Sequence, residues 1–287
     1  MKYAFIRDHA GQYPKRALCR SVGASPSGCY ALRSRPESGR LKANRALLQR
    51  IEEIRRQTLQ TYGPLRIRKE LLCQGIKAGL NRITKLKRQA GLITAQAKVW
   101  QRSSVGRTLE HIVEHRLLRR FWAEVPNQRW VGDITFISTA EGWLYLSVII
   151  DLFSRMIVGW SMNGSPTRSL ATEALEMALG RRGKPAKLML HTDQGVQYRT
   201  ANYQALLNSN GIEPSTSRKG NCLDNAAMES FFHTLKTEHV GHCRHLTRQQ
   251  ARQSLFDYIE VFYNRQRRHS YLDYMTPFEY EQRDAVS

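Results

Sequence analysis

The chain has 287 residues, 41% of them hydrophobic, and carries 45 Lys and Arg against 24 Asp and Glu, a net charge of +21. This length allows one large domain or two or three small ones. No apolar run approaches the roughly 18 residues of a membrane-spanning helix, and the N-terminus lacks the apolar segment of a signal peptide. We therefore expect a cytoplasmic protein that neither crosses nor lies on a membrane.

The positive charge is concentrated in the N-terminal part. Residues 1–125 contain 27 Lys and Arg but 8 Asp and Glu, whereas residues 126–287 contain 18 and 16. Basic segments bind polyanions, and neutralising DNA phosphates releases condensed counterions, which makes binding tight and salt dependent. The alternative is that the positive charge only keeps the protein surface soluble, but this explains less well why the charge is concentrated in the N-terminal part. We expect double-stranded DNA as the partner, and hence association with the nucleoid.

Residues 1–40 form a first helix-turn-helix-like segment. Arg16–Arg20 reads as one helix, which Gly23 ends. Ser25 is suited to cap a second helix with Pro26 at its first position, where the missing N–H of proline costs nothing. The composition of residues 33–40 is that of a linker.

A second helical domain is predicted over residues 41–100. Apolar spacing indicates a long helix over Leu41–Thr58. Two shorter helices then meet around Gly75, and the second is predicted over Arg82–Ala90 with Asn81 as its cap. A recognition helix in the major groove and a hairpin that touches only phosphates both fit this pattern. The side chains expected to face DNA are Arg82, Lys85 and Arg88.

A basic connector over residues 101–124 precedes a change of pattern to strands. The predicted order is three strands, a helix, a strand, a helix, a strand and a helix. This is the order of the ribonuclease H-like fold, an α/β core with a mixed five-stranded sheet, here over residues 125–240. A helical basic extension follows over residues 241–287. The predicted elements are Trp130–Ser138, Leu144–Leu152, Met156–Ser161, Arg168–Arg181, Lys187–His191, Arg199–Ser209, Ile212–Ser215 and Asn225–His239.

Three carboxylates occupy separate elements of this predicted core. Asp133 lies in the first strand, Asp193 follows the fourth, and Glu229 lies in the last helix, with 35 residues between Asp193 and Glu229. In a ribonuclease H-like sheet the first and fourth strands are neighbours, so the three side chains are expected to converge. Carboxylate oxygens suit Mg²⁺ or Mn²⁺. Two such ions about 4 Å apart clamp the attacking and leaving oxygens of a phosphodiester exchange.

Further DNA contacts are predicted beside these acids. Helical geometry places Asn225 and Lys236 within about 40° of Glu229 on the last helix, where Lys236 is suited to touch a phosphate; a solvated surface lysine is the alternative. The opposite face is apolar, with Met228, Phe231 and Leu235. A later basic cluster either lines the DNA channel or is an exposed helix end, and consists of Arg265, Arg267, Arg268 and His269.

The five cysteines are scattered and include no C-x-x-C pair, which favours reduced thiols over a disulfide framework. One of them lies in a group of potential metal ligands: His239, His242, Cys243 and His245. A zinc site and a solvated or DNA-facing loop both remain open for this group.

Four sequence blocks extend the pattern of the three acids. They are W-V-G-D-I-T at Trp130–Thr135, H-T-D-Q-G-V-Q-Y at His191–Tyr198, K-G-N-C-L-D-N-A-A-M-E-S-F-F at Lys219–Phe232, and Y-N-R-Q-R-R-H at Tyr263–His269 with T-P-F-E at Thr276–Glu279. In this order they resemble the second-frame (OrfB) transposases of the insertion-sequence-three family. These belong to the superfamily of D, D-35-E transposases and retroviral integrases.

The resemblance implies a polynucleotidyl transferase that performs 3′-end cleavage and strand transfer, with Asp133, Asp193 and Glu229 as catalytic metal ligands. It implies a homo-oligomer that holds the terminal inverted repeats and the target DNA. It also implies fusion to, or a complex with, a first-frame (OrfA) protein. Two alternatives stay open: a ribonuclease H-like nuclease or resolvase, and a catalytically silent DNA-binding regulator.

Overall fold

The computed structural model describes residues 2–29, 37–92, 117, 121–218 and 225–284. The chain divides into two compact units, Met1–Glu52 and Glu53–Ser287. Most of the predicted connector and residues 219–224 of the third sequence block lie outside the described residues. Among the helices that the structure describes, none combines the length and the apolar character needed to span a bilayer.

The first unit is helical. It contains α1 (Lys2–His9) and α2 (Lys15–Ser21). No helix was predicted at α1. It is held by tertiary contact, since Ile6 is buried in one cluster with Leu18 and Cys19 of α2. The long helix α4 (Gly39–Gln57) begins in this unit and confirms the helix predicted near Leu41–Thr58.

The second unit begins with two short helices around a turn, α5 (Pro64–Cys73) and α6 (Leu80–Gln89). They pack through four buried aliphatic side chains, Ile67, Leu71, Ile83 and Leu86. The predicted cap at Asn81 was wrong. The chain is extended at Gly79, with ψ of 144°, so the helix begins at Leu80 and Asn81 lies within its first turn.

Five strands of the described residues form one mixed sheet in the order β3-β2-β1-β4-β5. Strands β1, β2 and β3 are antiparallel neighbours, whereas β4 pairs parallel with both β1 and β5. This sheet confirms the ribonuclease H-like fold. The strands are β1 (Arg129–Thr139), β2 (Gly142–Asp151), β3 (Ile157–Asn163), β4 (Met189–Thr192) and β5 (Glu213–Thr216).

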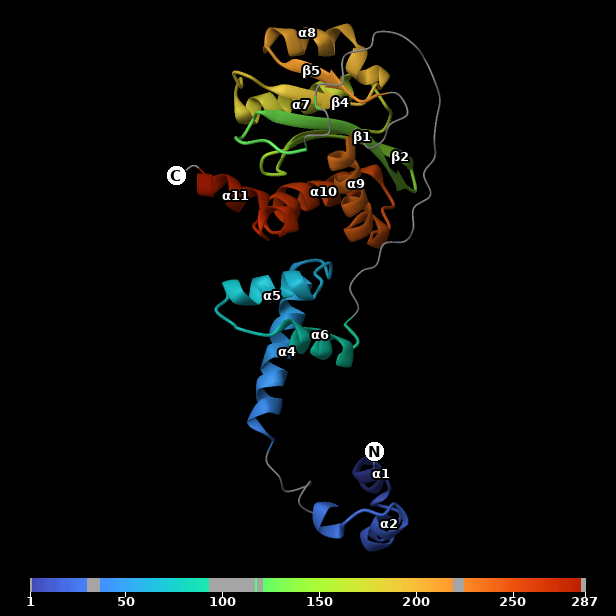
Figure 1. Ribbon diagram of the computed structural model, residues 1–287. Coiled ribbons are helices and arrows are strands. Elements are labelled where there is room, and N and C mark those ends of the chain that lie inside the picture. The colour runs from blue at the N-terminus through green and yellow to red at the C-terminus, as the bar shows by residue number, and fades with distance from the viewer. Residues whose placement is uncertain (1, 30–36, 93–116, 118–120, 219–224, 285–287) are drawn as a thin grey trace. The chain divides into compact units, whose positions relative to one another are not determined.

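Helices cover the sheet on both sides (Figure 1). Helix α7 (Ser169–Arg182) contacts β3 and α8 (Ala201–Ser209). Gly159 of β3 permits this packing, because a Cβ there would lie 2.2 Å from the carbonyl oxygen of Ala174. The core between these elements is built from buried apolar side chains such as Trp130.

The C-terminal helices lie on the other side of the sheet from α8 (Figure 1): α9 (Ala226–Glu238), α10 (Arg248–Phe256) and α11 (Pro277–Asp284). Within the helical extension predicted over residues 241–287, α10 is followed directly by a segment of π-helical geometry at Asp257–Tyr263. Asn264 follows it and ties this segment to β3, since its side-chain amide accepts from the Ile157 N–H at 2.9 Å and donates to the Ile157 carbonyl at 3.0 Å.

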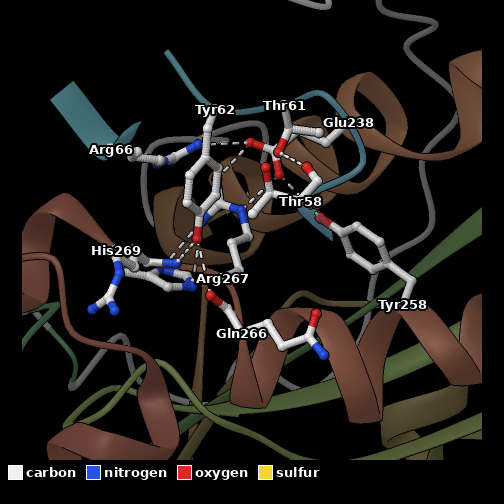
Figure 2. A network of polar contacts seen from close by, with 10 residues as sticks. Thr58, Thr61, Tyr62, Arg66, Glu238, Tyr258, Gln266, Arg267 and His269 are labelled. Atoms are coloured by element: carbon white, nitrogen blue, oxygen red, sulfur yellow. Dashed lines mark hydrogen bonds and ion pairs between the residues drawn. The ribbon is translucent and has the colours of Figure 1, made fainter. Parts of the chain in front are cut away.

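A polar network joins α5 to the C-terminal segment within the second unit (Figure 2). The Tyr62 hydroxyl donates to the carbonyl oxygen of Gln266 at 2.9 Å and accepts from the N–H of Arg268 at 2.8 Å. The Glu238 carboxylate, at the end of α9, pairs with Arg66 at 3.2 Å and with Arg267 at 2.6 Å. The helix-turn-helix-like part is thus connected to the helix that carries Glu229.

Candidate active site

Two of the predicted acids belong to neighbouring parallel elements: Asp133 lies within β1, and Asp193 directly follows β4. Val131 of β1 is opposite His191 of β4, and Asp133 and Asp193 each follow two residues later. Each carboxylate accepts a backbone hydrogen bond: Asp133 from Ile134 at 2.7 Å and Asp193 from Gly195 at 2.9 Å. The geometry of the sheet therefore holds both carboxylates in fixed orientations.

His191 anchors the strand that carries Asp193, a role that the sequence motif alone did not reveal. Its side chain is fully buried. Its ring nitrogens lie 2.9 Å from the Ser215 hydroxyl and 3.0 Å from the Ser217 hydroxyl. The two contacts fix β4 against β5, so the His191 side chain has a structural role two residues before Asp193. The sequence feature that could have indicated this role is the position of His191, two residues before Asp193.

Glu229 lies in the first turn of α9. The apolar face predicted for this helix is confirmed, because Met228, Phe231 and Leu235 are all buried. Burying that face leaves Glu229 directed toward β1, where its charge acts on Asp133. Helix α9 thus carries Glu229 close enough to Asp133 for the two charges to interact.

Asp193 and Glu229 both act electrostatically on the Asp133 carboxylate. Burial, followed by the charge of Asp193 and then that of Glu229, raises the pKa of Asp133 to about 8, against the backbone hydrogen bond and Lys236, which lower it. Burial lowers the pKa of Lys236, and the charge of Asp133 opposes this change. The Lys236 ammonium also lies 5.1 Å from the centre of the Phe136 ring. A cluster of carboxylates with a single neighbouring lysine favours the binding of further positive charge.

The predicted DNA contacts outside this cluster occupy different environments. Arg82, Lys85 and Arg88 are exposed on α6. Arg265 is also exposed, with its guanidinium 4.9 Å from the centre of the Phe278 ring. Asn225 precedes α9 and is buried, and its amide atoms have no hydrogen-bond partner among the described residues.

Arg267 and Arg268 require a correction. The sequence offered a DNA channel or an exposed helix end, but both side chains are buried and ion-paired within the protein. Arg267 binds Glu238 through two nitrogens, at 2.6 and 2.8 Å. Arg268 binds Glu70 of α5 at 2.6 Å. Their partners lie far away in the sequence, so composition alone made both arginines look available to DNA.

The comparisons with known proteins match these domains. Residues 123–222 and 229–284 match two family models that are both described as "Integrase core domain", and residues 42–99 match an "HTH-like domain". A chain with this sheet and these domains is an integrase-type transposase.

The relatives define the family. The chain is 38% identical over 290 residues to the transposase InsF for insertion sequence IS3A of Escherichia coli (strain K12), with 100% of both chains covered. It is 37% identical over 266 residues to a 31 kDa protein of insertion element IS600 from Shigella sonnei, with 93% of this chain and 98% of that protein covered. The chain belongs to the IS3 family of insertion-sequence transposases.

Among solved structures, the chain is similar to the HTLV-2 integrase catalytic core domain in complex with magnesium. That likeness has a TM-score of 0.43 and 22% sequence identity, and it covers 55% of this chain and 98% of that chain.

Proposed function

We propose that Asp133, Asp193 and Glu229 form the catalytic triad of this transposase and bind two divalent ions, Mg²⁺ or Mn²⁺. The observation that supports the proposal is the parallel pairing of β1 with β4 two residues before Asp133 and Asp193, together with the charges of Asp193 and Glu229, which both act on the Asp133 carboxylate. The chemistry is 3′-end cleavage followed by strand transfer. The attacking groups are water and a DNA hydroxyl, so the protein needs no covalent intermediate.

The donor set fits hard divalent ions. All three side chains offer carboxylate oxygen, the ligand that Mg²⁺ and Mn²⁺ prefer. Crowded carboxylates repel one another, and a cation relieves the cost that raises the pKa of Asp133. When bound, the ions lower the pKa of the attacking hydroxyl and stabilise the leaving oxygen.

Lys236 is a cation of the protein beside Asp133, and we propose that it positions a DNA phosphate beside the triad, with Asn225 at the start of the same helix. The exposed residues Arg82, Lys85 and Arg88 would contact the terminal repeats. The substrates are the two inverted repeats of the element and a target duplex. A homo-oligomer would hold both ends, with the first-frame protein as a fused or separate partner.

The test is a Mg²⁺-dependent cleavage-and-joining assay on labelled duplexes that carry the inverted repeats flanking the gene. Joined products should form with the wild-type chain and fall to background with Asp133→Asn, Asp193→Asn or Glu229→Gln, while DNA affinity stays within about twofold. Thermal unfolding of each variant checks its fold. Equal loss of DNA binding and joining in folded variants would assign the acids a structural role and refute the triad.

Two other outcomes address the alternatives. Metal-dependent cutting without joining, unchanged when the first-frame protein is added, would identify a nuclease. DNA binding without any chemistry, with or without that protein, would identify a regulator.

A further inference from the structure

A second group of metal-binding side chains lies directly after the helix that carries Glu229. It consists of His239, Cys243 and His245, which flank a short 3-10 helix at Val240–His242. One ligand atom from each residue lies within 4.8 Å of those of the other two. The group contains imidazole and thiol ligands and no carboxylate, so its metal preference differs from that of the acidic site.

The spacing of two of these ligands already approaches that of a tetrahedral ion. The Nδ1 atom of His239 lies 3.9 Å from the Sγ atom of Cys243. Nitrogen and sulfur ligands at zinc bond lengths of about 2.1 and 2.3 Å are about 3.6 Å apart across a tetrahedral angle. A small side-chain rotation therefore closes the remaining difference.

The second ring nitrogen of His239 is oriented as in metal-bound histidines. Its Nε2 lies 2.7 Å from the Ser254 hydroxyl of α10. An outer hydrogen bond of this kind fixes the tautomer and directs the other nitrogen toward the metal.

His245 supplies an independent observation. Its side chain is buried, with 8% of the residue exposed, yet neither ring nitrogen has a hydrogen-bond partner in the described parts of the chain. A buried polar group without a hydrogen-bond partner destabilises the folded protein, and such groups are rare without a function or a bound ion. Coordination by one nitrogen would remove part of this cost.

We propose that His239, Cys243 and His245 bind one Zn²⁺ ion, with solvent or an exogenous group as the fourth ligand. His242, the fourth member of the sequence cluster, does not belong to the set that the structure brings together and is exposed. Thiolate and imidazole ligands favour zinc over Mg²⁺. The ion would link the end of α9 to the start of α10, beside the turn between β1 and β2, where the N–H of Ala140 donates to the His245 carbonyl at 3.1 Å.

The test uses the full chain carrying Glu229→Gln, from which bound metal is first removed. Excess Mg²⁺ is then added, so that zinc binding at the acidic site does not contribute to the measured zinc affinity. Zinc affinity is measured by competition with a chromophoric chelator, and Co²⁺ is added as a spectroscopic probe. The expected results are one tightly bound zinc per chain and a cobalt spectrum with tetrahedral d–d bands and a thiolate charge-transfer band. Zinc should also raise the thermal unfolding temperature.

Matched variants locate the site. Removing a residue that only hydrogen-bonds to a metal ligand weakens metal binding by about 10–100-fold. Cys243→Ser and His245→Asn remove ligands themselves, so each should weaken zinc binding by at least ~10-fold. The thiolate band should disappear in Cys243→Ser. Cys73→Ser, which alters another exposed cysteine, and His242→Gln should leave affinity and spectrum unchanged.

Cys243 is exposed, so its replacement by serine should not unfold the metal-free protein, and thermal unfolding without zinc verifies this. Absence of stoichiometric zinc in the parent chain, or equal affinity in Cys243→Ser, would overturn the proposal. The contact between Cys243 and His239 would then be a thiol–imidazole hydrogen bond only.

Discussion

Gly159 shows how one missing side chain sets the distance between a strand and a helix. A Cβ at this position would lie 2.2 Å from the Ala174 carbonyl oxygen and 2.8 Å from the Ala178 Cβ. We therefore expect Gly159→Ala to destabilise the second unit by about 1–3 kcal/mol, the usual cost of overpacking. Chemical denaturation followed by tryptophan fluorescence measures the change.

Gly180 provides the matched control at the same scale. It lies in α7, and a Cβ there would meet nothing within 4 Å. Gly180→Ala should be neutral or stabilising by up to about 1 kcal/mol, because alanine is the better helix former. If both variants lost the same stability, the close approach at Gly159 would not be the cause of its effect.

At the scale of elements, the ion pair between Glu238 and Arg267 joins the end of α9 to the segment after the π-helical turn. The Arg267 side chain is buried, with 6% exposed, and that of Glu238 is largely covered, with 12% exposed; Arg66 of α5 contacts the same carboxylate. Glu238→Gln leaves Arg267 buried without its counter-charge, so we expect a loss of about 3–5 kcal/mol in the free energy of unfolding at neutral pH.

The pH dependence of this loss follows from the pKa of Glu238. Burial alone would raise that pKa, but hydrogen bonding and charge from Arg267 and Arg66 outweigh burial and lower it below the usual 4.5. The stability that the carboxylate contributes is therefore complete above pH 4.5 and is lost as pH falls through the lower, folded-state pKa. The difference between wild type and Glu238→Gln should be constant from pH 7 to about 4.5 and shrink below it.

Denaturant titrations of both proteins across this range measure the difference. A gap that stays constant down to pH about 3 would mean that the charge of Glu238 is not what stabilises the pair. Arg267→Met combined with Glu238→Met removes both charges, and we expect it to cost less than Glu238→Gln alone, because a buried charge without its partner is the main penalty.

At the scale of the whole molecule, the uneven charge predicts salt-sensitive DNA binding. The three exposed basic side chains of α6 are the described candidates for phosphate or base contact there. A plot of the logarithm of the DNA association constant against the logarithm of salt concentration has a negative slope. Replacing Arg82, Lys85 and Arg88 by alanine should make this slope less steep by about 1 for each phosphate contact removed. Fluorescence anisotropy over a salt series measures the slope with a terminal-repeat duplex and with an unrelated duplex.

The comparison of the two duplexes separates the interpretations left open for this helix. Equal weakening on both would indicate phosphate contacts, whereas a greater loss on the terminal repeat would indicate base readout. Lys184→Ala is the control, since that lysine is exposed and donates to the Ser209 carbonyl in the catalytic core. An unchanged slope in the triple variant would exclude α6 from the DNA-binding surface.

Local patterns in the sequence determined the order of strands and helices along the catalytic core and the apolar face of its last helix. These features repeat every two or 3.6 residues, so they can be read without knowledge of the fold. The short T-P-F-E block is of the same kind, because Thr276 and Glu279 cap each other's backbone N–H groups at the start of α11.

The tertiary structure alone decided which polar groups are paired with each other. Arg268 and Glu70 are 198 residues apart, and no local pattern distinguishes a buried arginine with such a partner from one that faces DNA. The same holds for helix α1, which depends on contacts with α2, and for the histidines after α9, where folding gathers His239 and His245 but leaves His242 outside. Ion pairs, buried clusters and metal ligands depend on distances in space, which the spacing of residues along the chain does not fix.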